Sequence, residues 1–131
     1  YLKQKGYQVS MVDINIELYN MRKEEYKTIW AIEQSSFWYN QTNVFNFFID
    51  NNKIIDDCIQ KILIFEPQVI GFSINSASLH FTLEFVKRIK ERKPQVKVVF
   101  GGPMFLVPVD IESILQNDYV DIIVLGEGEE E

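Results

Sequence analysis

The second half of the chain alternates between short runs of β-branched residues and longer stretches with helical spacing. Three of the runs are typical of buried strands: residues 68–72, 96–100 and 121–125. Helical patterns fill the intervals, over residues 79–93 and in a short segment that Asp110 can cap. Alternation of this kind predicts a parallel sheet whose strands are joined by right-handed helical crossovers, with helices on both faces.

The first half of the chain is patterned less regularly. Residues 1–6 have the pattern of a last helical turn closed by glycine, and residues 8–14 that of a short strand. An uneven helix is expected over residues 17–38. A firmer one is expected over residues 54–65, where a Glu-Pro pair stops it. Together the elements predict one α/β domain spanning residues 1–131, which begins inside an element and is therefore expected to be part of a longer protein.

Composition narrows the class of protein. A hydrophobic content of 47% in 131 residues predicts a packed domain rather than a disordered chain. The net charge of −6 disfavours nucleic acid as the main partner. A basic cluster at residues 87–93 is better interpreted as a solvated helix end. The sequence contains no signal peptide and no apolar run of about 18 residues, so no membrane contact and a cytoplasmic location are expected.

Two single residues could carry chemistry. Cys58 is the only cysteine, so no disulfide can form within the chain, and its spacing with Ile55 and Ile59 favours a buried hydrophobic role over a nucleophile. His80 is the only histidine, and a place near a helix start is favoured over a role as metal ligand.

The segment from residue 37 to residue 49 is rich in aromatic residues. It admits three interpretations: a local core cluster, a cap over a ligand, or a docking face; the core cluster is favoured. Its members are Trp38, Tyr39, Phe45, Phe47 and Phe48.

Small residues follow each of the three predicted strands. Ligands of parallel α/β sheets bind at the carboxyl ends of the strands, so these residues mark the candidate site. The first loop opens with Ser73 and Asn75 and can also be a plain N-cap loop, with Ser76 or Ser78 as the cap.

The other two loops are rich in glycine. They follow the second and third strands and consist of Gly101, Gly102 and Pro103, and of Gly126, Glu127 and Gly128. The alternatives are a tight strand-to-helix turn for the first and a linker for the second. Neither matches a phosphate loop.

The order and spacing of these motifs resemble the N-terminal cobalamin-binding domain of radical S-adenosylmethionine (SAM) proteins. The resemblance rests on the strand ends at Ser73, Gly101-Gly102-Pro103 and Gly126-Glu127-Gly128, and on the opening residues 2–15. It covers nearly the whole chain except residues 37–49.

The resemblance implies a flavodoxin-like, Rossmann-like fold with cobalamin (vitamin B12) over the carboxyl edge of the sheet. Ser73 would lie beside the cofactor, while Gly101 and Gly102 would make room for its nucleotide tail. The loop at Gly126 would lead to a radical SAM domain of the same full-length chain, which would hold a 4Fe-4S cluster and S-adenosylmethionine. The chain alone would not be catalytic, whereas the intact protein would carry out methyl transfer or another radical reaction.

The sequence departs from the related modules at several points. It lacks the D-x-H-x-x-G motif that carries the axial histidine, and the S-x-L motif is Ser73-Ile74-Asn75. A degenerate scaffold or interaction domain that does not bind cobalamin is therefore the main alternative. A phosphoacceptor receiver domain ranks lower, because Ser73 and Gly126 occupy the places where a receiver needs an aspartate and a lysine. A flavin-binding module also ranks low.

The first strand of the implied fold has no counterpart in the chain. That strand is central in the order 2-1-3-4-5, so its absence would leave two neighbours unpaired. Three compensations are expected: direct pairing of the strand at residues 8–14 with the next one, filling of the gap by a partner chain, or a strand swap. Each leaves the cobalamin site incomplete, so weak or no cobalamin binding and a tendency to self-associate are expected.

Overall fold

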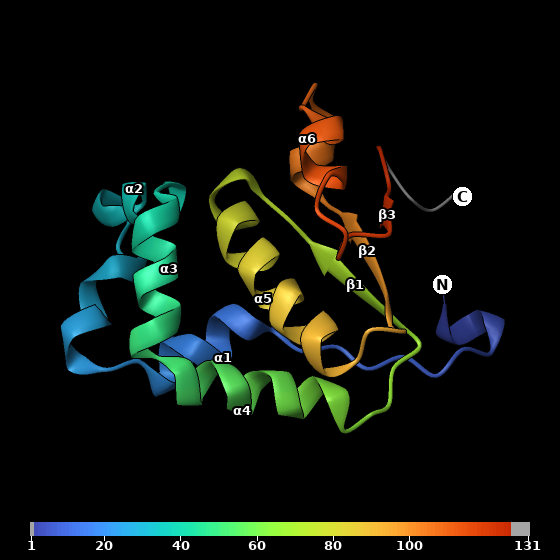
Figure 1. The fold of residues 1–131 in the computed structure, drawn as a ribbon, viewed down its shortest axis with the longest axis horizontal. Coiled ribbons are helices and arrows are strands. Elements are labelled where there is room, and N and C mark those ends of the chain that lie inside the picture. Colours follow the sequence, from blue (N-terminus) through green and yellow to red (C-terminus); the bar gives the residue numbers. More distant parts are fainter. Residues whose placement is uncertain (1, 127–131) are drawn as a thin grey trace.

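The computed structural model describes residues 2–126, and three parallel strands form its centre (Figure 1). The strands are β1 (Val69–Ser73), β2 (Lys97–Gly101) and β3 (Ile122–Ile123), in the order β1-β2-β3. Val69 pairs with Lys97 and Ser73 with Gly101, which aligns the carboxyl ends of β1 and β2. The predicted α/β class with a parallel sheet is confirmed, and it is consistent with a flavodoxin-like fold.

Helices make up most of the rest of the chain. The α-helices are α1 (Ile14–Met21), α2 (Ser36–Tyr39), α3 (Gln41–Asp50), α4 (Asn52–Leu63), α5 (Leu79–Arg92) and α6 (Ile111–Leu115). The 3-10 helices are η1 (Lys3–Lys5), η2 (Glu24–Trp30), η3 (Ile32–Gln34), η4 (Ser76–Ser78) and η5 (Pro103–Leu106). The helices expected over residues 54–65 and 79–93 are confirmed as α4 and α5, within two residues at each end.

The core lies between one face of the sheet and α5. Side chains alternate across a strand, so Ile70 and Phe72 of β1 share a face with Val98 and Phe100 of β2. The Phe85 ring of α5 packs edge-on against Phe72. The opposite face is more open, with Val69 57% and Ile122 51% exposed. The covered face therefore holds the sheet's hydrophobic stabilisation, while the other face is accessible.

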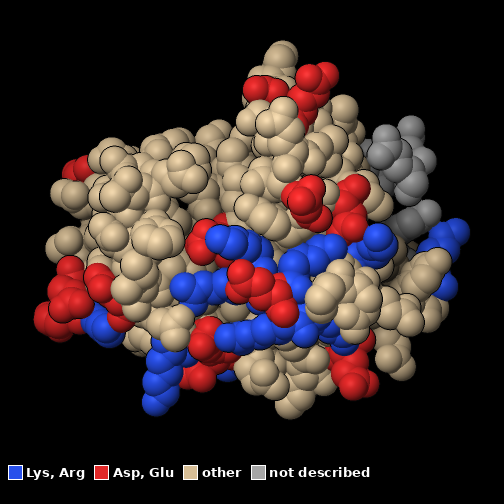
Figure 2. Space-filling model, in the orientation of Figure 1, with Lys and Arg blue, Asp and Glu red and all other residues tan. Residues whose placement is uncertain are grey.

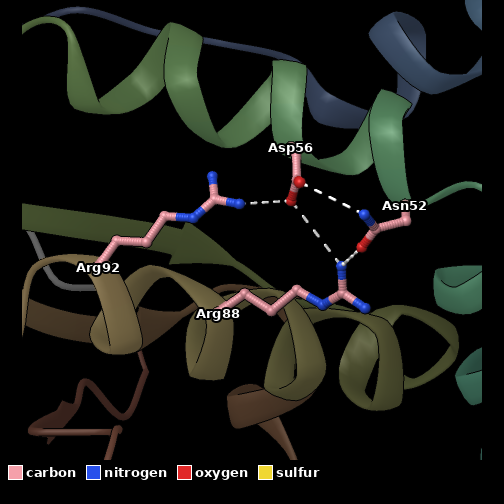
Figure 3. A network of polar contacts seen from close by, with 4 residues as sticks. All are labelled: Asn52, Asp56, Arg88 and Arg92. Atoms are coloured by element: carbon pink, nitrogen blue, oxygen red, sulfur yellow. Dashed lines mark hydrogen bonds and ion pairs between the residues drawn. The ribbon is translucent and has the colours of Figure 1, made fainter.

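A polar network joins α4 to α5 on the outside of this core (Figure 3). Arg92 donates to the Asp56 carboxylate at 2.5 Å, and Arg88 donates to the Asn52 side-chain oxygen at 2.6 Å. Figure 2 shows a band of Lys and Arg over these two helices, interleaved with Asp and Glu. Arg88 and Arg92 thus pair with polar and acidic side chains of α4. The interpretation of residues 87–93 as a solvated helix end holds only in part, because the Arg88 and Lys90 side chains are 20% and 15% exposed.

The strand predicted over residues 8–14 is wrong. Residues 7–13 form an irregular extended stretch, and α1 begins at Ile14, where the Asp13 carboxylate accepts the Ile16 N–H at 3.0 Å. A strand needs a neighbouring strand for its backbone groups, and within residues 2–126 β1 pairs only with β2. Direct pairing of this segment with β1, the first of the three expected compensations, is therefore not observed.

The uneven helix expected over residues 17–38 is also wrong in extent. The chain turns out of helical conformation at Arg22 and again at Ala31, where ψ is 143° and 145°. Trp30 then folds back onto α1, with its indole N–H donating to Asn15 at 2.7 Å. Tertiary contacts made by the aromatic side chains thus replace a continuous helix with α1, η2, η3 and α2.

The aromatic segment at residues 37–49 confirms the interpretation as a core cluster. Phe47 and Phe48 are buried, and Trp38 lies edge-on to Trp30 and Phe47. Helix α2 of this segment packs against η4 and α5. The cluster therefore also supports the loop that follows β1. Tyr39 and Phe45 remain more than half exposed, and the ligand cap and docking face stay predictions for them.

Candidate functional site

The carboxyl ends of β1 and β2 gather most of the predicted site residues. Ser73 and Gly101 are paired in the register of the two strands, and Gly102 and Pro103 follow directly. Asn75 lies two residues beyond Ser73, at the start of η4. The strand order that the sequence predicted thus brings these five residues to one edge of the sheet.

Ser73 and Asn75 differ in what their side chains can do. Ser73 is exposed, and its hydroxyl has no hydrogen-bond partner within residues 2–126, so it is free to bind a ligand. The Asn75 side chain instead accepts the Ser78 N–H at 2.9 Å, and the Ser78 hydroxyl accepts the Asn75 N–H at 3.1 Å. This reciprocal capping box makes Asn75 the cap of η4. Ser78, one of the two caps that the sequence offered, is the N-cap residue of α5 but makes no side-chain capping hydrogen bond there.

The two adjacent glycines have different structural requirements. A Cβ at Gly101 would meet only Val124, at the ordinary contact distance of 3.9 Å. Gly102 has φ 103° and ψ −173°, a conformation essentially restricted to glycine. A Cβ there would lie 2.6 Å from the Ile74 nitrogen and 2.8 Å from the Ser73 hydroxyl oxygen. The chain itself therefore requires Gly102, while nothing in the described structure requires Gly101.

The loops after β2 and β3 meet near Gly126. Pro103 is exposed and begins η5, where a missing N–H is tolerated. Gly126 has a positive φ of 76°, and its N–H donates to the Phe105 carbonyl at 3.4 Å. The predicted site residues Glu127 and Gly128 lie outside the described residues.

The charge at this edge limits the ligand. Residues 73–86 and 98–131 contain no Lys or Arg at all. In Figure 2 the basic side chains form their band over α4 and α5, below the carboxyl ends of the strands as Figure 1 orients them. A ligand held mainly through phosphate groups would require cations or a glycine-rich phosphate loop. The edge therefore fits a ligand that carries little negative charge.

The strongest electrostatic feature of the described residues lies at the other end of β3, and no motif in the sequence marked it. The Asp121 carboxylate accepts from the Lys90 ammonium at 2.6 Å, from the Val98 N–H at 2.8 Å and from the Lys97 ammonium at 3.0 Å. Burial opposes ionisation of Asp121, but these three donors outweigh it and hold its pKa well below the usual range. Asp121 thus fastens β3 to β2 and α5; an acidic residue inside an apolar strand run was the available signal.

Neither single reactive residue forms a site. Cys58 is fully buried in α4, and this burial raises the pKa of its thiol, as predicted for a hydrophobic role. His80 is half-buried at the second position of α5. Within residues 2–126, no three His, Cys, Asp or Glu side chains are grouped so as to hold a metal ion. The same described residues include no helix that is long and apolar enough to span a membrane.

The geometry defines a class of protein: a parallel α/β module with an accessible carboxyl edge whose loops contain no Lys or Arg. The family model of the B12 binding domain matches residues 39–131, well over half of the chain. The chain therefore belongs to the B12 binding domain family. No curated protein and no solved structure shows significant similarity to it.

The residues at the edge fit the corrin ring of cobalamin but leave no space for its nucleotide tail beside Gly102. The free hydroxyl of Ser73 and the unobstructed Gly101 suit a broad ring laid against the edge. The space beside Gly102, which the resemblance assigns to the nucleotide tail, is filled by Ser73 and Ile74 of the chain itself.

Proposed function

We propose that this chain is a cobalamin-binding module that holds the corrin ring against the carboxyl edge of its sheet. The observation that carries the proposal is the family match over residues 39–131 together with the pairing of exposed Ser73 with partly exposed Gly101 at that edge. The Ser73 hydroxyl donates a hydrogen bond to an amide side chain of the ring or accepts one from it. Gly101 allows the ring to approach the backbone closely.

We further propose that the module serves a radical SAM enzyme. Cobalamin supplies the methyl-transfer or radical chemistry when it is bound, and the chain positions and shields it. The resemblance of the loop at Gly126 supports a following domain with an iron–sulfur cluster and S-adenosylmethionine.

Self-association through the free edge of β1 also remains a prediction, since within residues 2–126 β1 has one neighbouring strand.

Gly101→Ala tests the site without disturbing the fold. The added methyl group has room in the chain, but it would stand between the backbone and a bound ring. We expect cobalamin to bind about tenfold more weakly, the effect of a modest steric misfit. Titration of the protein with hydroxocobalamin, followed by absorbance and by quenching of tryptophan fluorescence, measures the affinity.

The matched control is Gly71→Ala. Gly71 lies two residues before Ser73 on the same face of β1, and a Cβ there meets nothing within 4 Å. Unchanged affinity in the control and lower affinity in Gly101→Ala would support the site. Equal affinity in both variants would place the ligand elsewhere. Absence of binding to the unmodified chain would favour the alternative of a scaffold that does not bind cobalamin.

His80→Ala is expected to leave the absorption spectrum of bound cobalamin unchanged. The imidazole is half-buried on α5, and we assign it no bond to cobalt. A histidine ligand would displace the cofactor's own base or a water molecule and shift the visible bands. A clear shift on His80→Ala, in absorbance or in the electron paramagnetic resonance of the cob(II)alamin form, would contradict this assignment.

A further inference from the structure

The loops that follow β1 and β2 are joined directly to each other. The Ile74 N–H donates to the Gly101 carbonyl at 2.8 Å, and the Met104 N–H donates to the Ile74 carbonyl at 3.0 Å. The side chain of Ile74 is fully buried. The hydrogen-bonded ladder of the sheet thus continues past the ends of the strands into the loops.

Gly102 completes this junction. Its missing side chain leaves space beside the backbone, but the Ile74 nitrogen and the Ser73 hydroxyl oxygen occupy that space, 2.6 and 2.8 Å from where a Cβ would stand. A group inserted between the two loops would have to displace this backbone and break both hydrogen bonds. The space that Gly102 leaves open is therefore occupied by Ser73 and Ile74, and no ligand group fits there.

The charge of the loops agrees with this reading. The nucleotide tail of cobalamin carries a phosphodiester anion. No Lys or Arg is present in residues 73–86 or 98–131, so no cation from these loops can meet it. The amides at the start of η4 are partly used as well, because the Asn75 side chain accepts the Ser78 N–H.

From these contacts we infer that the chain recognises the corrin ring alone. The nucleotide tail does not enter the space between the loops that follow β1 and β2. The inference rests on the proposed function and concerns how that site holds its cofactor. It predicts that cobinamide, the corrinoid without the nucleotide, binds as tightly as cobalamin. Any contacts between the nucleotide tail and the protein would then contribute little to the affinity.

The test compares hydroxocobalamin with aquahydroxocobinamide on the unmodified chain, by fluorescence quenching of its two tryptophans and by mutual displacement. We expect dissociation constants within about threefold of each other, less than the tenfold ratio that corresponds to about 1.4 kcal/mol. Gly101→Ala should weaken both corrinoids by the same factor, because both present the same ring.

Amide hydrogen exchange gives a second, independent readout. The Ile74 and Met104 amides should keep their protection when hydroxocobalamin is bound, since their hydrogen bonds stay intact. Cobinamide binding at least tenfold more weakly than cobalamin, or loss of protection at these two amides, would overturn the inference and leave the proposed function standing. If neither corrinoid binds, the proposed function fails and the inference with it.

Discussion

Gly102→Ala is expected to lower the free energy of unfolding by about 3 kcal/mol, through backbone strain and steric overlap together. The residue adopts φ 103° and ψ −173°, and a Cβ would lie 2.6 Å from the Ile74 nitrogen. That neighbour is backbone held by the hydrogen bond to Gly101, so it cannot move aside without breaking the junction between the two loops. Urea unfolding followed by circular dichroism measures the change.

The adjacent residue provides the control. Gly101→Ala introduces the same methyl group one position earlier, where the nearest neighbour is 3.9 Å away and φ is not positive. Its stability should stay within about 0.5 kcal/mol of the original. The two substitutions thus test separately the expected role of position 102 in stability and the proposed role of position 101 in binding. Equal stability of the two variants would show that Gly102 is not needed by the fold.

Asp121→Ala is expected to cost about 3 kcal/mol at neutral pH, because it leaves a mostly buried Lys90 ammonium and the Val98 N–H without their partner. The Lys90 and Asp121 side chains are 15% and 18% exposed, so water replaces the lost contact poorly. Lys97→Gln is the matched control. Its side chain is 64% exposed, and removing this outer ion pair should cost less than about 1 kcal/mol.

The same carboxylate makes stability depend on pH. The pKa of Asp121 is lowered in the folded state relative to 3.8 for an unperturbed carboxyl. The unfolded chain therefore takes up the proton first as the solution becomes acidic. The stabilisation is complete above the unfolded value and is lost as the pH falls from about 4 toward the lowered pKa.

Unfolding in urea at pH 7 and at about pH 3 tests this sign. The difference in unfolding free energy between the unmodified chain and Asp121→Ala should narrow in acid, because near pH 3 the unfolded chain binds a proton at Asp121 that the folded chain does not. An equal difference in unfolding free energy at both pH values would contradict the assignment of this pH dependence to the Asp121 carboxylate.

Local patterns were enough for the elements that carry strong hydrophobic periodicity. Helix α5 ends directly before Lys93-Pro94, and α4 ends three residues before the Glu-Pro pair. Strand β3 lies within its β-branched run, and β1 and β2 each extend one residue beyond theirs. The carboxyl-edge site followed from the same alternation. A parallel order of strands requires their ends to meet, so Ser73 and Gly101 could be placed together before their contacts were known.

Residues 8–14 failed as a strand because strand formation depends on a neighbour, which no local pattern contains. The extent of the first helix failed for a related reason. The chain turns out of helical conformation so that Trp30, Trp38 and Phe47 pack edge-on against one another, and only the folded chain shows which aromatic rings can meet.

By itself, the sequence determined the α/β class, the two main helices, the buried nature of Cys58 and the edge of the sheet at which most of the candidate site residues meet. Only the tertiary structure decided what each residue at that edge does. Gly101 and Gly102 are identical in sequence terms, yet one has open space beside it and the other is enclosed by Ile74 and Ser73. Likewise, the sequence does not show that Asp121 forms ion pairs with Lys90 and Lys97, because both lysines are distant from it along the chain. Periodicity reports which way a side chain faces, whereas distances between segments depend on the packing of the whole domain.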